Sequence, residues 1–175
     1  GFGHTGLMWG CDHASITPDI MCMGKGLTGG MMSLAAMATS KNISETISNS
    51  DIGVIMHGPT FMGNALACSV ANASIDLLVN SNWQSKVKNI ESIFTKELKD
   101  LEDINIVADV RTIGAIGVVE LKDDTKAQEV QDFCVKNGVW IRPFGKLVYS
   151  IVSYNITDDE LYKITSTIKE AIKSL

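Results

Sequence analysis

The pattern of apolar and polar positions changes near residue 103. The earlier part combines short apolar runs, glycine-rich turns and long helical stretches, which is typical of a piece of an α/β domain. The later part has β-branched runs separated by turn residues, together with amphipathic helices, which predicts a compact α+β unit with a small antiparallel sheet. We therefore expect one domain over residues 1–103 and a second over residues 104–175.

Two short strands and three helices are predicted in the earlier part. The apolar run over residues 19–23 predicts a strand covered on both faces, and residues 33–39 predict a neighbouring strand that pairs with it. Helices are expected over residues 40–48, 65–79 and 83–101. The second helix is apolar or small nearly all round, so it should be buried, and Asn64 is placed to cap it.

Four strands and two helices are predicted in the later part. The strands are expected over residues 104–110, 113–121, 139–142 and 146–151. Thr125 with Gln128 fits a capping box for a helix that ends at Lys136. Thr157 with Glu160 fits a second capping box, which opens the last helix.

One lysine stands alone in the glycine-rich turn that follows the first strand. Gly24 and Gly26 flank Lys25, and their lack of side chains lets a flat cofactor or substrate approach the backbone. A lysine at the end of a buried strand can be partly desolvated, which favours the neutral amine that attacks carbonyl groups. By itself, the pattern also fits a solvated lysine in an ordinary turn.

Two other positions are candidates for binding anions. Thr60 and the nearby N–H groups precede a long helix and could face an anion, although an ordinary capped loop fits equally. Arg142 ends an apolar strand and precedes Pro143, where its planar guanidinium could meet a carboxylate. A surface salt bridge is the alternative for Arg142.

Composition and charge exclude several classes of partner. The net charge of −5 comes without any basic run, which argues against nucleic acid. No apolar run approaches the length of a membrane span. The four cysteines are far apart, as in a cytoplasmic protein with reduced thiols. Cys11, His13 and His4 lack a fourth ligand, so no metal site is expected.

Three sequence blocks carry a resemblance to a known enzyme family. G-F-G-x-T-G covers residues 1–6, P-D-I-x-x-x-G-K-x-L-T-G-G covers residues 18–30, and T-F-x-G-N-x-L-A-C covers residues 60–68. In this order and spacing they resemble the class III, fold-type I aminotransferases that use pyridoxal 5′-phosphate (PLP). The resemblance implies an α/β fold: the C-terminal part of the large PLP-binding domain with its linking helix, then the small C-terminal α+β domain.

Three further blocks are similar to one subfamily of these enzymes. They cover residues 57–64, 107–120 and 138–147. This subfamily transfers the amino group of S-adenosylmethionine to 8-amino-7-oxononanoate in biotin biosynthesis, which gives 7,8-diaminononanoate. The resemblance also implies a homodimer whose active site is shared across the interface.

The resemblance implies a role for five residues. Lys25 would bind PLP covalently and would move a proton during the reaction, because lysine can serve as both nucleophile and base. Pro59 and Thr60 would bind the PLP phosphate, in this family from the neighbouring subunit. Gly58 would lie against the substrate, and Arg142 would bind the carboxylate of the amino-oxononanoate.

The sequence also departs from the family pattern. His4 stands where the family usually has arginine, and residues 151–154 replace a stretch that usually carries two prolines. The family's aspartate that pairs with the PLP ring nitrogen is expected upstream of G-F-G, outside this chain. The isolated chain is therefore expected to be inactive. Two alternatives stay open: another class III ω-aminotransferase, acting on ornithine, 4-aminobutyrate or a similar amine, or a non-catalytic fragment that keeps the fold.

Overall fold

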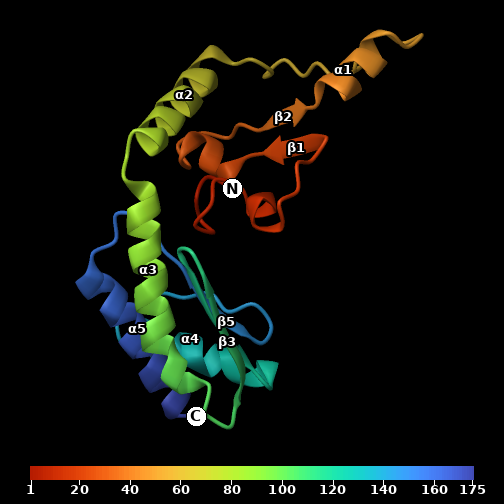
Figure 1. The fold of residues 1–175 in the computed structure, drawn as a ribbon. Helices are drawn as coiled ribbons and strands as arrows, with labels where there is room; N and C mark the ends of the chain where they lie inside the picture. The colour runs from red at the N-terminus through yellow and green to blue at the C-terminus, as the bar shows by residue number, and fades with distance from the viewer. The chain divides into compact units, whose positions relative to one another are not determined.

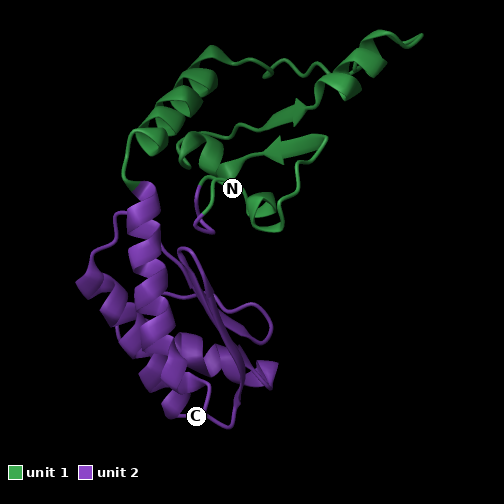
Figure 2. Cartoon of the chain, in the orientation of Figure 1, with its two compact units in different colours: residues 1–2, 7–82 green, residues 3–6, 83–175 purple.

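The computed structural model describes residues 1–175, which form two compact units (Figure 2). Unit 1 consists of residues 1–2 and 7–82, and unit 2 consists of residues 3–6 and 83–175. The domain boundary expected after residue 103 stays a prediction, whereas the contacts divide the chain after residue 82. The reason is the helix α3 (Trp83–Leu98), which packs against the strands and the last helix of unit 2.

Unit 1 is built around a β-hairpin and one long helix (Figure 1). Strand β1 (Ile20–Met23) pairs antiparallel with β2 (Ala36–Thr39), which confirms the predicted strand pair. The helices of this unit are η1 (Gly10–Ala14), η2 (Lys25–Thr28), α1 (Lys41–Ser48) and α2 (Ala65–Val79). The two η elements are 3₁₀-helices, and η2 packs against α2.

The predicted burial of unit 1 is wrong in two places. Strand β1 was expected to be covered on both faces, yet Ile20 is 53% exposed. Helix α2 was expected to be buried, yet Leu66 and Leu77 are 65% and 76% exposed. Only the face of α2 that carries Ala67 and Ala71 is buried. An apolar pattern shows which side chains could be buried. In unit 1, most of these side chains do not pack against another element of the chain and stay exposed.

Unit 2 is a three-stranded antiparallel sheet covered by helices (Figure 1). The sheet order is β3-β4-β5, and α3 packs on β3 and β4 while α5 packs on α3 and α4. After α3 the elements are η3 (Lys99–Leu101), β3 (Val107–Ile113), β4 (Ile116–Leu121), η4 (Asp124–Lys126), α4 (Ala127–Lys136), β5 (Leu147–Ile151) and α5 (Asp158–Lys173). The core includes Phe94, Leu98, Val119, Leu121, Leu161 and Ile172, each at most 1% exposed.

Local chemistry explains where unit 2 agrees with the sequence and where it does not. The Thr157–Glu160 capping box is present at the start of α5. The predicted Thr125 box is wrong, because Asp123 instead accepts a hydrogen bond from the Thr125 N–H at 2.9 Å. Residues 139–142 form no strand, which makes the predicted strand wrong; the pairing beside the Gly145 turn is limited to the isolated Phe144–Leu147 bridge.

Two further features bear on the class of protein. None of the helices combines the length and the apolar character that a membrane-spanning segment requires. All four cysteines are free, and burial raises the pKa of the Cys134 thiol to about 11. This thiol is therefore protonated near neutral pH and unreactive, because the nucleophile is the thiolate.

Candidate active site

Strand β1 leads directly into the turn that carries Lys25. After Gly24, the 3₁₀-helix η2 begins at Lys25 and ends at Thr28, and the next residue, Gly29, has a left-handed φ of 58°. Lys25 itself has a φ of 47°. This conformation costs a residue with a side chain about 1–2 kcal/mol, and such strain is concentrated at functional sites. The turn thus holds its lysine in a conformation that must be maintained by the surrounding structure.

Lys25 and Pro59 line the same cavity in unit 1. Its volume is about 610 Å³, within the range of small-molecule and cofactor sites. The other lining residues are Gly24, Gly30, Met32, Ser33, Leu34, Ala35, Phe61, Met62 and Gly63. Lys25 is the one charged side chain of this lining, and it makes no ion pair in the structure. The cavity therefore presents an amine and supplies no carboxylate.

Not every predicted feature of this cavity is present. Gly58 and Thr60 are exposed in the loop beside Pro59, but neither is part of the cavity lining. Lys25 was expected to be partly desolvated, and its side chain is instead exposed. The reason is that, apart from Gly24 and Lys25 itself, the cavity is lined only by Gly30, residues 32–35, Pro59 and residues 61–63.

The loop that carries Pro59 is fixed by local hydrogen bonds. The Met62 N–H donates to the Pro59 carbonyl at 2.9 Å, and the Asn64 N–H donates to the Phe61 carbonyl at 3.0 Å. Asn64 then caps α2, because its side-chain oxygen accepts from the Ala67 N–H at 3.0 Å. This confirms the predicted cap and explains how the start of α2 positions the cavity wall.

Arg142 lies in unit 2 and has a free guanidinium. It lines a cavity of about 250 Å³ together with Trp140, Ile141, Tyr149, Ser150 and Ile151. The chain has two arginines. Arg111 is bound by Asp109 at 2.6 Å and by Glu120 at 2.8 Å, whereas Arg142 makes no ion pair. Arg142 is thus the arginine available to bind a carboxylate from outside the chain.

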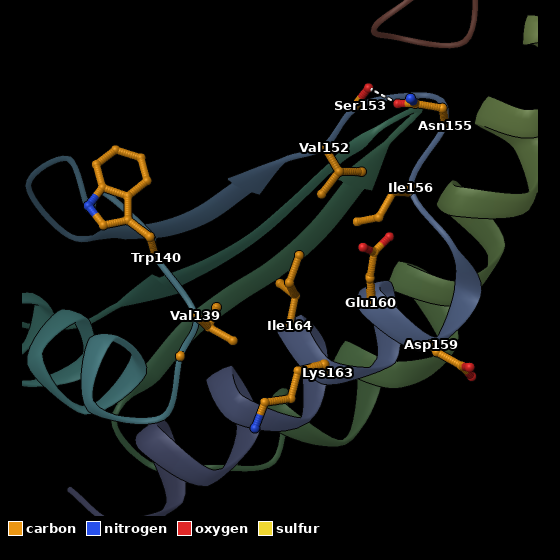
Figure 3. Close-up of a pocket in the computed structure, with 11 residues that line it drawn as sticks. Val139, Trp140, Val152, Ser153, Asn155, Ile156, Asp159, Glu160, Lys163 and Ile164 are labelled. Atoms are coloured by element: carbon orange, nitrogen blue, oxygen red, sulfur yellow. Dashed lines mark hydrogen bonds between the residues drawn. The ribbon is translucent and has the colours of Figure 1, made fainter.

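A larger cavity in unit 2 contains none of the predicted site residues (Figure 3). Its volume is about 740 Å³, and it lies between residues 138–140, residues 152–156 and helix α5. In Figure 3, Val152, Ile156 and Ile164 point toward one another, whereas Asp159 and Lys163 point outward. Val152 and Ser153, which replace the family's usual prolines, both lie on its lining.

His4, the other departure from the family pattern, belongs to unit 2. Its ring is tilted against Tyr154, with the ring centroids 5.2 Å apart. The His4 carbonyl accepts a hydrogen bond from the Ala115 N–H at 2.8 Å. Burial raises the pKa of Tyr154 to about 12, so its phenol is neutral over the physiological range. His4 therefore contributes a ring contact and a backbone anchor to the turn between β3 and β4.

Sequence reasoning missed several residues around Lys25. Met32, Ser33 and Ala35 line the cavity because the chain turns back after η2 toward β2. Ser74, on α2, donates a long hydrogen bond of 3.4 Å to the Gly26 carbonyl. The apolar run before β2 predicted a strand but gave no indication of a cavity wall. Nothing in the sequence indicated that Ser74 would contact the turn that carries Lys25.

The family assignment rests on most of the chain. The model of the class-III aminotransferase family matches residues 1–172. The chain therefore belongs to the class-III aminotransferases. The predicted fold class is confirmed, because the chain has the fold of part of a fold-type I PLP-dependent transferase.

Curated relatives narrow the comparison to one kind of enzyme. An adenosylmethionine-8-amino-7-oxononanoate aminotransferase from Buchnera aphidicola of Acyrthosiphon pisum is 49% identical over 98% of this chain and 40% of its own length. A protein of the same name from Corynebacterium glutamicum is 41% identical over 99% of this chain and 41% of its own length. The chain thus spans about 40% of the length of the relatives it matches.

Solved structures agree with this assignment. The adenosylmethionine-8-amino-7-oxononanoate aminotransferase of Methanocaldococcus jannaschii matches with a TM-score of 0.89 and 32% identity, over 99% of this chain and 44% of that one. A PLP-bound amine transaminase from an uncultivated Pseudomonas species matches with a TM-score of 0.92 and 26% identity, over 99% of this chain and 42% of that one.

Proposed function

We propose that the full-length protein transfers the amino group of S-adenosylmethionine to 8-amino-7-oxononanoate, in biotin biosynthesis and with PLP as cofactor. The relatives with this name are 41% and 49% identical over nearly the whole chain, which supports the substrates. The observation that carries the chemistry is Lys25, an unpaired amine on a left-handed turn at the edge of a cavity. We further propose a cytoplasmic homodimer.

The residues present fit one end of the cofactor. PLP, when bound, supplies a reactive aldehyde carbon and a ring that accepts electrons from the substrate. The Lys25 amine is the nucleophile that would hold this aldehyde covalently, and the cavity of about 610 Å³ has room for the ring. No carboxylate lines the cavity, so a partner for the ring nitrogen must come from other residues of the full-length protein.

The other predicted residues have separate tasks in this proposal. The Lys25 amine, once free, would act as the base that takes the proton from the substrate carbon and returns it. Pro59 and Thr60 would bind the phosphate of the cofactor in the partner subunit. Gly58 would leave room for the substrate, and Arg142 would orient the acceptor by a paired hydrogen bond to its carboxylate.

Domain organisation follows the same proposal. Residues 1–103 would be the C-terminal part of the large PLP-binding domain, with α3 as the linking helix. Residues 104–175 would be the small domain that carries Arg142. Because the cavity around Lys25 lacks a carboxylate and one side of it is open, we propose that the 175-residue chain alone is inactive.

The test is an absorbance spectrum of the full-length protein with PLP, before and after S-adenosylmethionine. We expect a band of lysine-bound PLP that S-adenosylmethionine converts to the pyridoxamine form. Lys25→Ala should abolish the band and lower kcat by at least about 10⁴-fold, because it removes both nucleophile and base. Lys41→Ala, at an exposed lysine paired with Glu45, is the matched control and should change neither.

Three outcomes would change the proposal. A normal band that ignores S-adenosylmethionine but responds to another amine would keep the fold and favour a different ω-aminotransferase. Full activity in Lys25→Ala would remove the central residue of the mechanism. Transamination by the 175-residue chain alone would show that no other residues are needed.

A further inference from the structure

The turn that carries Lys25 ends at a buried threonine, Thr28. Thr28 is 1% exposed, and its hydroxyl donates to the Met32 carbonyl at 2.5 Å. Its own carbonyl accepts from the Met31 N–H at 3.1 Å. This hydrogen bond offsets the cost of burying the hydroxyl, because a buried hydroxyl without a partner is destabilising. Thr28 thus fixes the path of the chain where it leaves η2.

This hydrogen bond joins the end of η2 to the segment that lines the cavity beside Lys25. Lys25 is the first residue of η2 and Thr28 is the last. Residues 32–35 line the cavity together with Lys25, whereas Thr28 itself does not line it. The Thr28–Met32 bond therefore sets the position of the lysine relative to the wall it faces.

The residue after Lys25 is held between two other side chains. A Cβ on Gly26 would lie 2.8 Å from Cδ2 of Phe2, so the glycine fits closely against that ring. On α2, the Ser74 hydroxyl donates to the Gly26 carbonyl at 3.4 Å, and a Cβ on Gly29 would lie 3.2 Å from its oxygen. Ser74 therefore contacts both ends of the turn and joins it to α2.

We propose that Thr28 and Ser74 are positioning residues that hold Lys25 in its left-handed conformation toward the cavity. A residue with a side chain keeps a φ of 47° only where the surroundings over-determine it. Without the two hydroxyl contacts, the turn relaxes and the amine leaves its place at the cavity edge. The proposal rests on the proposed function, in which this amine captures PLP.

The test measures capture of PLP at Lys25 in the full-length protein. Borohydride reduction fixes PLP on the lysine, and mass spectrometry of the peptide gives the site and the rate of capture. We expect Thr28→Val to slow capture about fivefold, the loss of one hydrogen bond, and Thr28→Ser to restore it. Ser74→Ala should slow capture about twofold, since its hydrogen bond is longer. Thr28→Val should also shift the pH midpoint of the bound-PLP absorbance.

Two controls separate positioning from a general loss of stability. Thr165 on α5 is also fully buried, and its hydroxyl donates to the Leu161 carbonyl at 3.1 Å. Thr165→Val should therefore lower thermal stability as Thr28→Val does, yet leave capture and the pH midpoint unchanged. Ser69→Ala, at an exposed serine of the same helix as Ser74, should also leave capture unchanged.

The outcomes distinguish this inference from the proposed function. Unchanged capture and pH midpoint in both Thr28→Val and Ser74→Ala would overturn the inference. So would capture that falls only in proportion to the unfolded fraction. If Thr28→Val does not fold, Ser74→Ala decides alone. If Lys25→Ala still captures PLP at the wild-type rate, the proposed function fails; if it captures none while both hydroxyl variants are normal, only the positioning role fails.

Discussion

Unit 2 and unit 1 differ most in what their apolar residues pack against. In unit 2, the apolar face of α3 packs on the sheet and on α5, and α5 also packs on α4, so that Val87, Phe94 and Leu161 are fully buried. In unit 1, the buried side chains are those of Leu27, Thr28, Ala67 and Ala71. Large side chains such as Met31, Met56 and Leu77 are at least 76% exposed there.

The proposed catalytic lysine therefore lies in the unit with the smaller buried core. Lys25 and Pro59 line a cavity in unit 1, whose large apolar surface is uncovered. Uncovered apolar surface of this kind marks an interaction site in natural proteins. Since the chain spans about 40% of its relatives' length, we expect unit 1 to reach full stability only in the full-length protein.

The largest expected effect is a contrast in amide hydrogen exchange between the units. In the 175-residue chain, we expect protection factors on the order of 10⁴ in α3 and α5, because their opening requires exposure of the core. In β1 and β2 we expect values below about 10, because few buried contacts hold them. Exchange followed by peptide mass spectrometry measures both regions in one sample.

The full-length protein is the control for this contrast. There, β1 and β2 should become as protected as α3. Equal protection of both units in the 175-residue chain would mean that unit 1 is held by contacts other than buried apolar area. It would contradict the conclusion that the two units differ in stability because their cores differ.

Phe94→Ala should have the largest effect of any single substitution on the free energy of unfolding of unit 2. The ring is fully buried, and large-to-small changes at such sites cost about 3–5 kcal/mol. Denaturant unfolding followed by exchange of α5 amides gives the value. Leu77→Ala, at an exposed residue of unit 1, is the control and should cost less than about 0.5 kcal/mol. A small loss in Phe94→Ala would show that the unit 2 core is not cooperative.

The same contrast explains which parts of the fold the sequence could predict. The helix over residues 83–101 and the last helix were predicted well, because a one-sided stripe and a capping box are local properties. The burial of β1 and α2 was predicted wrongly, because an apolar pattern does not say what covers it. The prediction of a strand at residues 139–142 was wrong for a related reason. Strand pairing requires a neighbouring strand with free hydrogen-bonding groups, and the apolar run itself does not show whether one is present.

The candidate site divides in the same way. Lys25 stood out because a lysine between glycines after an apolar strand is a local signal. The contact from Ser74 to Gly26 joins residues 48 positions apart, and only packing of α2 on η2 creates it. Thr28 was visible as part of a motif, but its bond to Met32 depends on the left-handed Gly29 and Gly30 that turn the chain back.

A smaller effect is expected from filling the contact between α3 and the sheet. A Cβ on Gly117 would lie 2.6 Å from Cδ1 of Phe94, closer than carbon atoms can approach. Gly117→Ala should therefore destabilise unit 2 by about 1–3 kcal/mol, the usual cost of overpacking. Gly10→Ala, in unit 1, meets no atom within 4 Å and is the matched control. Equal unfolding midpoints for the two variants would mean that Phe94 moves freely, which would contradict a tightly packed core.

The smallest effect concerns the first turn of α5 and its dependence on pH. Thr157 and Glu160 form a reciprocal pair of hydrogen bonds, and the bond from the Thr157 N–H, at 2.9 Å, holds the pKa of Glu160 below its usual value. A lowered pKa in the folded state stabilises unit 2 above the pKa of the unfolded chain, and this stabilisation is lost as the pH falls through the folded value. Thr157→Ala should cost about 1 kcal/mol at neutral pH, the usual value of a lost cap.

The cost of Thr157→Ala should shrink as the pH falls through the folded pKa of Glu160, because the Thr157 hydroxyl also donates to the Glu160 carboxylate at 2.8 Å and alanine removes that bond. Urea unfolding of the wild type and of Thr157→Ala, at pH 7 and at pH 3, measures the difference in the free energy of unfolding at each pH. Glu160→Gln is the control variant, because it keeps an acceptor but cannot titrate. A cost that stays the same at both pH values would mean that the stabilisation comes from the bond between the Glu160 N–H and the Thr157 hydroxyl, without a contribution from the Glu160 carboxylate. Because α5 belongs to unit 2 and packs on α3 and α4, a change in the exchange of unit 1 amides in the same variants would mean that the two units do not unfold separately.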